Sequence, residues 1–190
     1  NIKETAEYKE GLLNGKNFMF YSNGKKHINS IYKNDSLNDL YEYFNNKGAL
    51  IERKYFKSGL LDGDYKSFFK VGEQLIEFEI PYKKGEIDGD VFEYYANGNL
   101  YAKSTYISGK KEGLETVYHY NKSISSEIEY VNGEVHGNFK QYHSNGKPSE
   151  IGQSLEGSYE GDWKMYYTNG KLQAEYSYKK GKLDNLYRYF

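Results

Sequence analysis

The chain has 190 residues, with 26 basic and 27 acidic side chains and a formal net charge of −1. This balance excludes a bulk electrostatic attraction to nucleic acid or to an anionic membrane. The absence of cysteine excludes disulfides, thiolate metal ligands and cysteine nucleophiles. The apolar content is carried by 23 Tyr and 10 Phe rather than by Leu and Val, and no apolar run approaches the roughly 20 residues of a membrane-spanning helix.

The first seven residues are polar and lie outside the repeat that fills the rest of the chain. They predict an N-terminal linker or a frayed first strand, followed by one repeat domain over residues 8–190. Because the sequence begins at Asn1 without a Met, a removed signal peptide and a cut from a longer chain are both expected origins. The location stays open, with an extracytoplasmic or cell-surface position favoured.

One period organises residues 8–190. A turn glycine recurs at steps of 24 residues with one step of 26, a second glycine follows four residues later, and an aromatic residue follows five residues after that. The turn column is Gly11, Asp35, Gly59, Gly85, Gly109, Gly133, Gly157 and Gly181; the second column is Gly15, Asp39, Gly63, Gly89, Gly113, Gly137, Gly161 and Asn185; the aromatic column is Phe20, Phe44, Phe68, Tyr94, Tyr118, Tyr142, Tyr166 and Phe190.

The units predict short strands in chain order. The unit over residues 34–57 lacks both glycines and is the most irregular, while the strand that ends at Pro81 is expected to be longer than the others. From Gly85 to Tyr178 the register is regular. The sequence therefore predicts an all-β fold, an elongated and twisted antiparallel meander of about eight 24-residue hairpin repeats in a single-sheet ribbon.

The stretch from Trp163 to Asn185 specifies a register. Asn169-Gly170 and Lys180-Gly181 each predict a two-residue hairpin turn, because glycine supplies the positive φ that such turns need. Glycine in the second column is expected to leave room for a bulky neighbour across the strand. The predicted cross-strand pairs are Tyr167 with Leu172, Met165 with Ala174, Lys164 with Glu175, Trp163 with Tyr176, Tyr178 with Leu183 and Tyr176 with Asn185.

These columns resemble the MORN-repeat variant family over essentially the whole chain. The stretch from Gly157 to Lys182 fits the family unit closely, with Trp163, Tyr166, Tyr167, Asn169-Gly170-Lys171-Leu172, Glu175, Tyr178 and Gly181 in place. The resemblance implies a hairpin-repeat architecture. Since the unit also occurs in proteins similar to YwqK-type antitoxins and in bacterial surface or secreted proteins, it implies an antitoxin or immunity role as one alternative.

Catalytic and metal chemistry find little support in the sequence. His119 and His143 occupy equivalent positions in successive units, about 9.6 Å apart, which is too far for a shared zinc ion. His27 is expected to be an isolated surface residue. No glycine-flanked serine and no phosphate-binding loop are present. We therefore expect no enzyme activity, no cofactor, no metal site and no nucleic-acid partner.

A binding surface is the remaining hypothesis, and it rests on the position after the aromatic column, which varies between units. Variation leaves recognition and neutral drift as equal alternatives, and exposed rings offer rigid contact area. The leading function is a protein-protein interaction module with an unidentified protein partner, with a glycan-binding adhesin segment as the first alternative. The candidate binding residues are Tyr21, Phe69, Tyr95, His119, His143, Trp163 and Tyr167.

Overall fold

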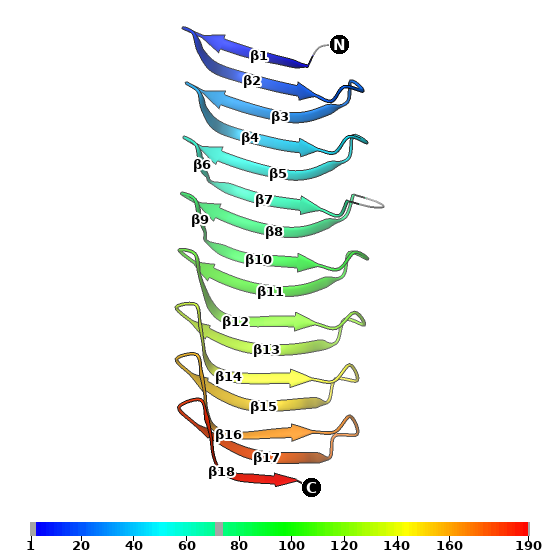
Figure 1. Ribbon diagram of the computed structural model, residues 1–190, viewed down its shortest axis with the longest axis vertical. Helices are drawn as coiled ribbons and strands as arrows, with labels where there is room; N and C mark the ends of the chain where they lie inside the picture. The colour runs from blue at the N-terminus through cyan, green and yellow to red at the C-terminus, as the bar shows by residue number, and fades with distance from the viewer. Residues whose placement is uncertain (1–2, 71–73, 190) are drawn as a thin grey trace. The chain divides into compact units, whose positions relative to one another are not determined.

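The computed structural model describes residues 3–70 and 74–189, with side chains up to residue 184. It divides into two compact units, residues 1–98 and 99–190. Every regular element in the described residues is a β-strand (Figure 1). Strands joined by a turn or a loop within a unit pair antiparallel. The predicted all-β meander of hairpin repeats is confirmed.

Unit 1 begins with a strand over part of the segment predicted to be a linker or a frayed strand, since residues 4–9 pair with residues 12–19. Two of its strands are split by short interruptions, so that β6 and β9 precede β7 and β10. Its strands are β1 (Glu4–Lys9), β2 (Leu12–Phe20), β3 (Lys26–Lys33), β4 (Ser36–Phe44), β5 (Leu50–Lys57), β6 (Leu60–Leu61), β7 (Gly63–Phe68), β8 (Ile76–Lys83), β9 (Glu86–Ile87) and β10 (Gly89–Tyr94).

Unit 2 contains four hairpins of nearly identical length. Its strands are β11 (Leu100–Ile107), β12 (Lys110–Tyr118), β13 (Ile124–Val131), β14 (Glu134–Tyr142), β15 (Pro148–Leu155), β16 (Ser158–Tyr166), β17 (Leu172–Lys179) and β18 (Lys182–Tyr189).

Two kinds of connection alternate along each unit. The short connection is the predicted two-residue turn, as at Lys180 (φ 51°) and Gly181 (φ 73°), where both central residues have positive φ. The longer connection has three loop residues. Tyr167 N–H donates to Lys171 C=O at 2.9 Å, and Gly170 N–H donates to Tyr167 C=O at 2.8 Å.

One predicted cross-strand pair, next to the longer loop, is wrong. Tyr166, rather than Tyr167, lies opposite Leu172. The prediction placed Gly170 as the second residue of a two-residue turn, whereas Gly170 is the last residue of a three-residue loop. One extra residue, Gln173, then restores the predicted register. The pairs Met165 with Ala174, Lys164 with Glu175 and Trp163 with Tyr176 are confirmed.

The second glycine column marks a bulge. Tyr178 lies opposite Leu183 as predicted, but Tyr176 lies opposite Tyr187, so the predicted pair with Asn185 is wrong. A Cβ on Gly113 (φ 76°) would meet nothing within 4 Å, and the same holds for Gly161 (φ 69°). At these two positions glycine is therefore required by the positive φ of the bulge, not by a bulky neighbour.

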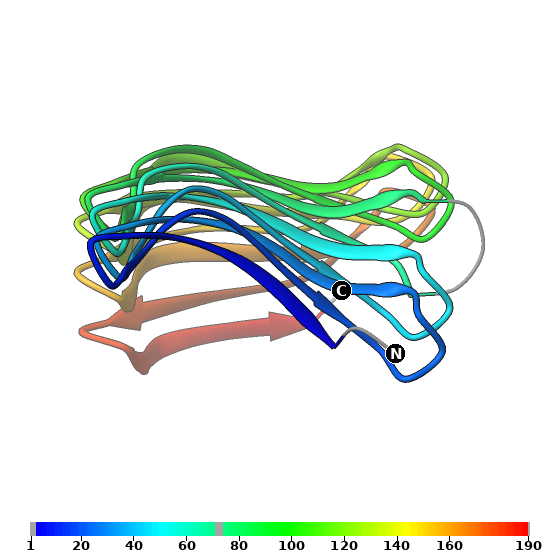
Figure 2. The same cartoon turned by 90° about the horizontal axis from the view of Figure 1, so that it is seen from above.

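The strands within each unit are arched along their length (Figure 2), as expected for a twisted sheet. In unit 2 one core cluster consists of Phe139, Trp163, Ala174 and Tyr176. Gly152 lies directly beside the indole ring of Trp163. In unit 1, Leu50, Ile51 and Phe68 are buried.

Candidate functional site

We call the position after the aromatic column the variable column, and the edge of each unit that carries the three-residue loops the loop edge. Side chains of the variable column lie at the loop edge and bond to the next repeat. Tyr21 Oη donates to Phe44 C=O at 2.7 Å. His119 Nε2 lies 2.9 Å from Tyr142 C=O, and His143 Nε2 lies 2.8 Å from Tyr166 C=O. Because a carbonyl only accepts, each histidine must carry its proton on Nε2. Three of the candidate binding residues thus make the same kind of hydrogen bond, from the side chain to a backbone carbonyl of the following hairpin.

The other candidate residues differ in their exposure. Trp163 is only 1% exposed, so its assignment as a contact residue is wrong: its ring fills the core of unit 2. Phe69 and Tyr95 are half-buried, and Tyr167 is 43% exposed. Equivalent positions within a unit are about 9.6 Å apart, since one strand separates them.

The hydrogen bond from His119 to Tyr142 C=O predicts different stabilities for two substitutions at His119. His119→Phe should destabilise unit 2 by about 1 kcal/mol, because it leaves Tyr142 C=O without its donor. His119→Tyr should be close to neutral, since Tyr21 makes the same bond in unit 1. Urea unfolding of both variants checks this, and equal losses of unfolding free energy would contradict a hydrogen-bonding role.

Other polar groups at the loop edge also connect successive hairpins. Asn23 Nδ2 donates to Asn46 C=O at 2.8 Å, and Asn145 Nδ2 donates to Thr168 C=O at 2.7 Å. Lys147 Nζ donates to the carbonyl of the next loop at 2.7 Å. The loop edge is therefore a hydrogen-bonded stack in which side chains of one loop bond to backbone carbonyls of the next.

The histidines offer no metal site. His27, predicted to be isolated, lies in an aromatic cluster instead, with its ring 4.3 Å from the ring of Tyr21 and 5.5 Å from that of Tyr43. Among the side chains described, in residues 3–70 and 74–184, no three His, Asp or Glu side chains converge in a way that could hold a metal ion.

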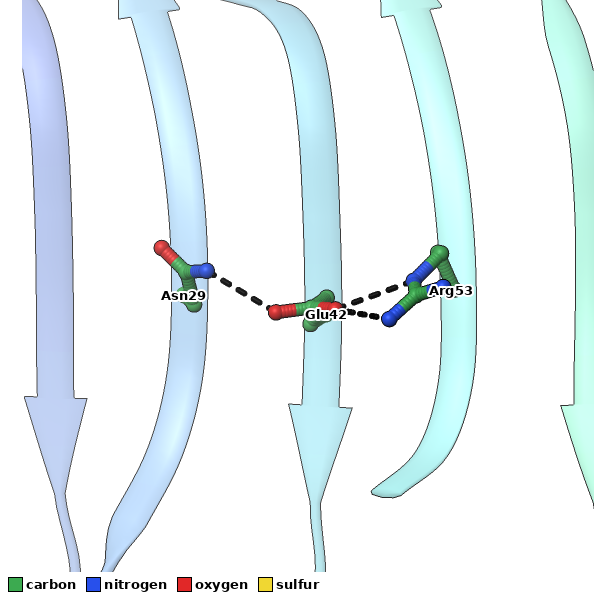
Figure 3. A network of polar contacts seen from close by, with 3 residues as sticks. All are labelled: Asn29, Glu42 and Arg53. Atoms are coloured by element: carbon green, nitrogen blue, oxygen red, sulfur yellow. Dashed lines mark hydrogen bonds and ion pairs between the residues drawn. The ribbon is translucent and has the colours of Figure 1, made fainter.

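One face of unit 1 carries a charge ladder across neighbouring strands. Glu42 on β4 accepts from Asn29 on β3 at 2.9 Å and from both Nε and Nη2 of Arg53 on β5 (Figure 3). Further along, Lys66 bonds to Glu79 at 2.6 Å and lowers the pKa of the Glu79 carboxyl. Within the ladder, Glu42 is matched by Arg53 and Glu79 by Lys66.

Unit 2 contains a polar cluster that the sequence analysis did not single out. Lys111 Nζ lies 4.7 Å from the ring centroid of Tyr130 and 5.8 Å from that of Tyr106, and it bonds to Glu115. Burial lowers the pKa of Lys111, but the hydrogen bond and charge of Glu115 outweigh burial, so that the pKa is raised. The sequence signal for this cluster was the recurrence of Tyr at the repeat position of Tyr106 and Tyr130.

Burial and a partner carboxylate act in the same direction on Tyr142. Its hydroxyl donates to Glu127 Oε2 at 2.7 Å. Burial first, and this bond second, raise the pKa of Tyr142 to about 12. The hydroxyl therefore acts as a hydrogen-bond donor between strands and offers no base for catalysis at neutral pH.

Exposed aliphatic side chains lie at the turn edge of unit 2, which is the edge that carries the two-residue turns. Ile107, Val131 and Leu155 are the last residues of β11, β13 and β15, and they are 58%, 41% and 49% exposed. We call these three residues the aliphatic stripe. In unit 1 the last residue of the equivalent strands is an exposed lysine: Lys9, Lys33, Lys57 and Lys83.

The family signature begins near the end of unit 1 and continues through unit 2. The model of the MORN repeat variant matches residues 87–108, 111–132, 135–154 and 159–180. The chain belongs to the MORN repeat variant family. No curated protein matches the chain significantly. Among the residues described, no helix of this MORN-variant protein is long and apolar enough to cross a membrane.

Proposed function

We propose that this MORN-variant protein is a non-catalytic module that binds a protein partner through the aliphatic stripe of unit 2. The observation that carries the proposal is the exchange of lysine for Ile107, Val131 and Leu155 at one repeat position. Lysine is compatible with the fold there, as unit 1 demonstrates, so folding does not require exposed aliphatic side chains. Apolar side chains that repeat on an otherwise polar edge favour a contact surface.

A non-catalytic role is supported by the use of the polar side chains. His119 and His143 bond to backbone carbonyls, and the carboxylates of Glu112 and Glu160 accept the backbone N–H groups of Asn132 and Lys180. Groups held in this way serve the stacking of repeats. They are not arranged as a nucleophile with an adjacent base.

The test replaces the stripe with the side chain that unit 1 already has. The triple variant Ile107→Lys, Val131→Lys, Leu155→Lys should lose captured partners by at least about tenfold, because three apolar contacts become three solvated charges. Quantitative capture from the proteome of the source organism measures this. The unfolding midpoint should stay near that of the unsubstituted chain.

A matched control adds positive charge one residue further along. Lysine occurs naturally at the first turn position, as Lys84 and Lys180. The control variant Ser108→Lys, Asn132→Lys, Glu156→Lys should therefore keep its partners. Equal loss in both variants would attribute capture to net charge, and unchanged capture by the stripe variant would refute the stripe as the contact surface.

Glycan binding is a second candidate, because Tyr120 and Tyr167 are 64% and 43% exposed at the loop edge. Exposed rings can stack on sugar faces, which are apolar. A glycan array probed with Tyr120→Ala and Tyr167→Ala variants tests it. Glycan binding that both substitutions leave unchanged would remove these rings as the site.

A further inference from the structure

Asparagine followed by glycine is chemically labile, because glycine has no side chain to shield its backbone nitrogen from the neighbouring carboxamide. The chain contains this pair at several places in its turns, loops and bulges. The pairs are Asn14-Gly15, Asn23-Gly24, Asn97-Gly98, Asn132-Gly133, Asn145-Gly146 and Asn169-Gly170. The sequence does not rank them, whereas the hydrogen bonds of the asparagine side chains do.

Two asparagines at the loop edge are held at both ends of the carboxamide. Asn23 Nδ2 donates to Asn46 C=O at 2.8 Å, and Asn23 Oδ1 accepts Lys25 N–H at 3.0 Å. Asn145 makes the same two bonds in unit 2, at 2.7 and 3.0 Å. Both bonds must break before such a side chain can turn toward the nitrogen of the following glycine.

Other asparagines of the set are held by fewer bonds. Asn14 Nδ2 donates to Asn34 Oδ1 at 2.9 Å, and Asn169 Oδ1 accepts Lys171 N–H at 2.8 Å. Asn97 has an interaction partner as well. The carboxamides of Asn14 and Asn169 are therefore restrained, but less than those of Asn23 and Asn145.

Asn132 differs because it lies in a two-residue turn at the turn edge of unit 2. Its φ is 54°, that of Gly133 is 90°, and both residues are exposed. The backbone N–H of Asn132 donates to Glu112 Oε2 at 2.8 Å. Among the side chains described, up to residue 184, none bonds to the Asn132 carboxamide. This carboxamide is therefore free to rotate toward the Gly133 nitrogen.

The attacking nitrogen is restrained to a similar degree in the turn and in the loops. Gly133 N–H donates to Lys111 C=O at 2.9 Å, and the N–H groups of Gly24, Gly146 and Gly170 each donate to one backbone carbonyl at 2.8 to 2.9 Å. One backbone bond must open in every case. The side-chain bonds thus decide which asparagine reacts first.

We propose that Asn132 is a site of spontaneous deamidation in this protein. The Gly133 nitrogen, after losing its proton to a base, attacks Cγ of Asn132. The bond from Cγ to Nδ2 breaks, Nδ2 takes up a proton, and ammonia leaves a five-membered succinimide. Water then opens this ring at either carbonyl and gives aspartate or isoaspartate. The reaction consumes water alone and adds one negative charge to the chain.

The product would change the turn edge beside the aliphatic stripe, because Asn132 directly follows Val131. The new carboxylate would lie in the turn whose N–H is bonded to the carboxylate of Glu112. Isoaspartate also adds one carbon to the backbone of a two-residue turn that is fitted to Lys111 and Glu112. The proposal goes beyond the proposed function, since the reaction is intramolecular and needs no partner.

Peptide mapping by mass spectrometry tests the proposal. The folded 190-residue chain is incubated at mildly alkaline pH, and conversion at each asparagine is followed over time. Asn132 should convert at least about tenfold faster than Asn23 and Asn145, because each of those must first lose side-chain hydrogen bonds. Asn169 should fall between them. Conversion of Asn132 no faster than that of Asn23 and Asn145 would overturn the proposal.

The same incubation in concentrated urea separates the fold from the sequence. Without the hydrogen bonds of the loops, Asn23, Asn132 and Asn145 should convert at similar rates, because each is followed by glycine. An advantage of Asn132 that persists unchanged in urea would show that its turn and free carboxamide are not the cause, and would contradict the structural argument.

A blocked variant assigns the acidic form that isoelectric focusing of the intact chain should reveal. Asn132→Gln should remove most of that form, since glutamine would have to close a six-membered ring, which is much slower. Asn23→Gln is the matched control and should leave the acidic form in place. Circular dichroism confirms that both variants are folded. Formation of the acidic form at an unchanged rate in Asn132→Gln would refute Asn132 as the site.

Discussion

Replacing Gly152 with Ala is expected to destabilise unit 2 by about 1–3 kcal/mol, the usual cost of overfilling a packed core. A Cβ at this position would overlap the indole ring of Trp163 at Cδ2 and Cε2. The ring cannot give way cheaply, since it is 1% exposed and its centroid lies 5.1 Å from that of Phe139 and 4.3 Å from that of Tyr159. Urea unfolding measures the loss.

A double-mutant cycle separates this clash from other effects of the substitution. In a Trp163→Val background, Gly152→Ala should cost almost nothing, although Trp163→Val itself should cost about 3–5 kcal/mol. Gly157→Ala is the control, because a Cβ there meets nothing within 4 Å and only the positive φ (74°) is strained. Its cost should be the same in both backgrounds. An equal cost of Gly152→Ala in both backgrounds would contradict the packing argument.

Substitutions at the bulge position of the second glycine column should change stability in opposite directions in two repeats. Gly137→Ala should destabilise unit 2 by about 2 kcal/mol or more, because φ is 109° and the added Cβ would overlap Glu129 Oε2. That carboxylate accepts Asn138 N–H at 2.7 Å, a bond that also lowers the pKa of Glu129. Asp39→Gly should instead stabilise unit 1 by about 1 kcal/mol, since Asp39 already has φ 88°.

The matched control at the same site is Asp39→Ala. Alanine has no side-chain oxygen to ease positive φ, so it should be less stable than Asp39, while glycine should be more stable. Thermal unfolding of the three forms gives the order. If Asp39→Gly is no more stable than the original, backbone strain at the bulge is not what selects glycine in this column.

The period of the repeat predicted the strands and the two-residue turns, because both depend on local chemistry. The exact register was harder to predict. Asn169-Gly170 is compatible with a two-residue turn and with a three-residue loop, and only the hydrogen bonds of Tyr167 distinguish them. The bulge after Asp184 inserts two residues at the second glycine column, which was interpreted as room for a bulky neighbour, so the pair of Tyr176 with Tyr187 was not predicted.

The structural roles of the candidate residues were not predictable where one role tolerates several residue types. Tyr21, His119 and His143 differ in sequence, which suggested recognition, but each ring can bring a polar donor to the same carbonyl. Burial of Trp163 depends on Gly152 in the neighbouring strand, which single-strand alternation does not reveal. The aliphatic stripe was accessible from the sequence, since alignment on the turn glycine places Val131 where unit 1 has lysine.

Photo-crosslinking tests most directly whether partners contact the turn edge. A photoreactive phenylalanine analogue placed at Val131 compares the turn edge with the same group placed at Tyr167 on the loop edge. Both positions are about equally exposed, at 41% and 43%. We expect covalent partner adducts from position 131 and few from position 167. Adducts from position 167 alone would contradict the assignment of the aliphatic stripe as the binding surface.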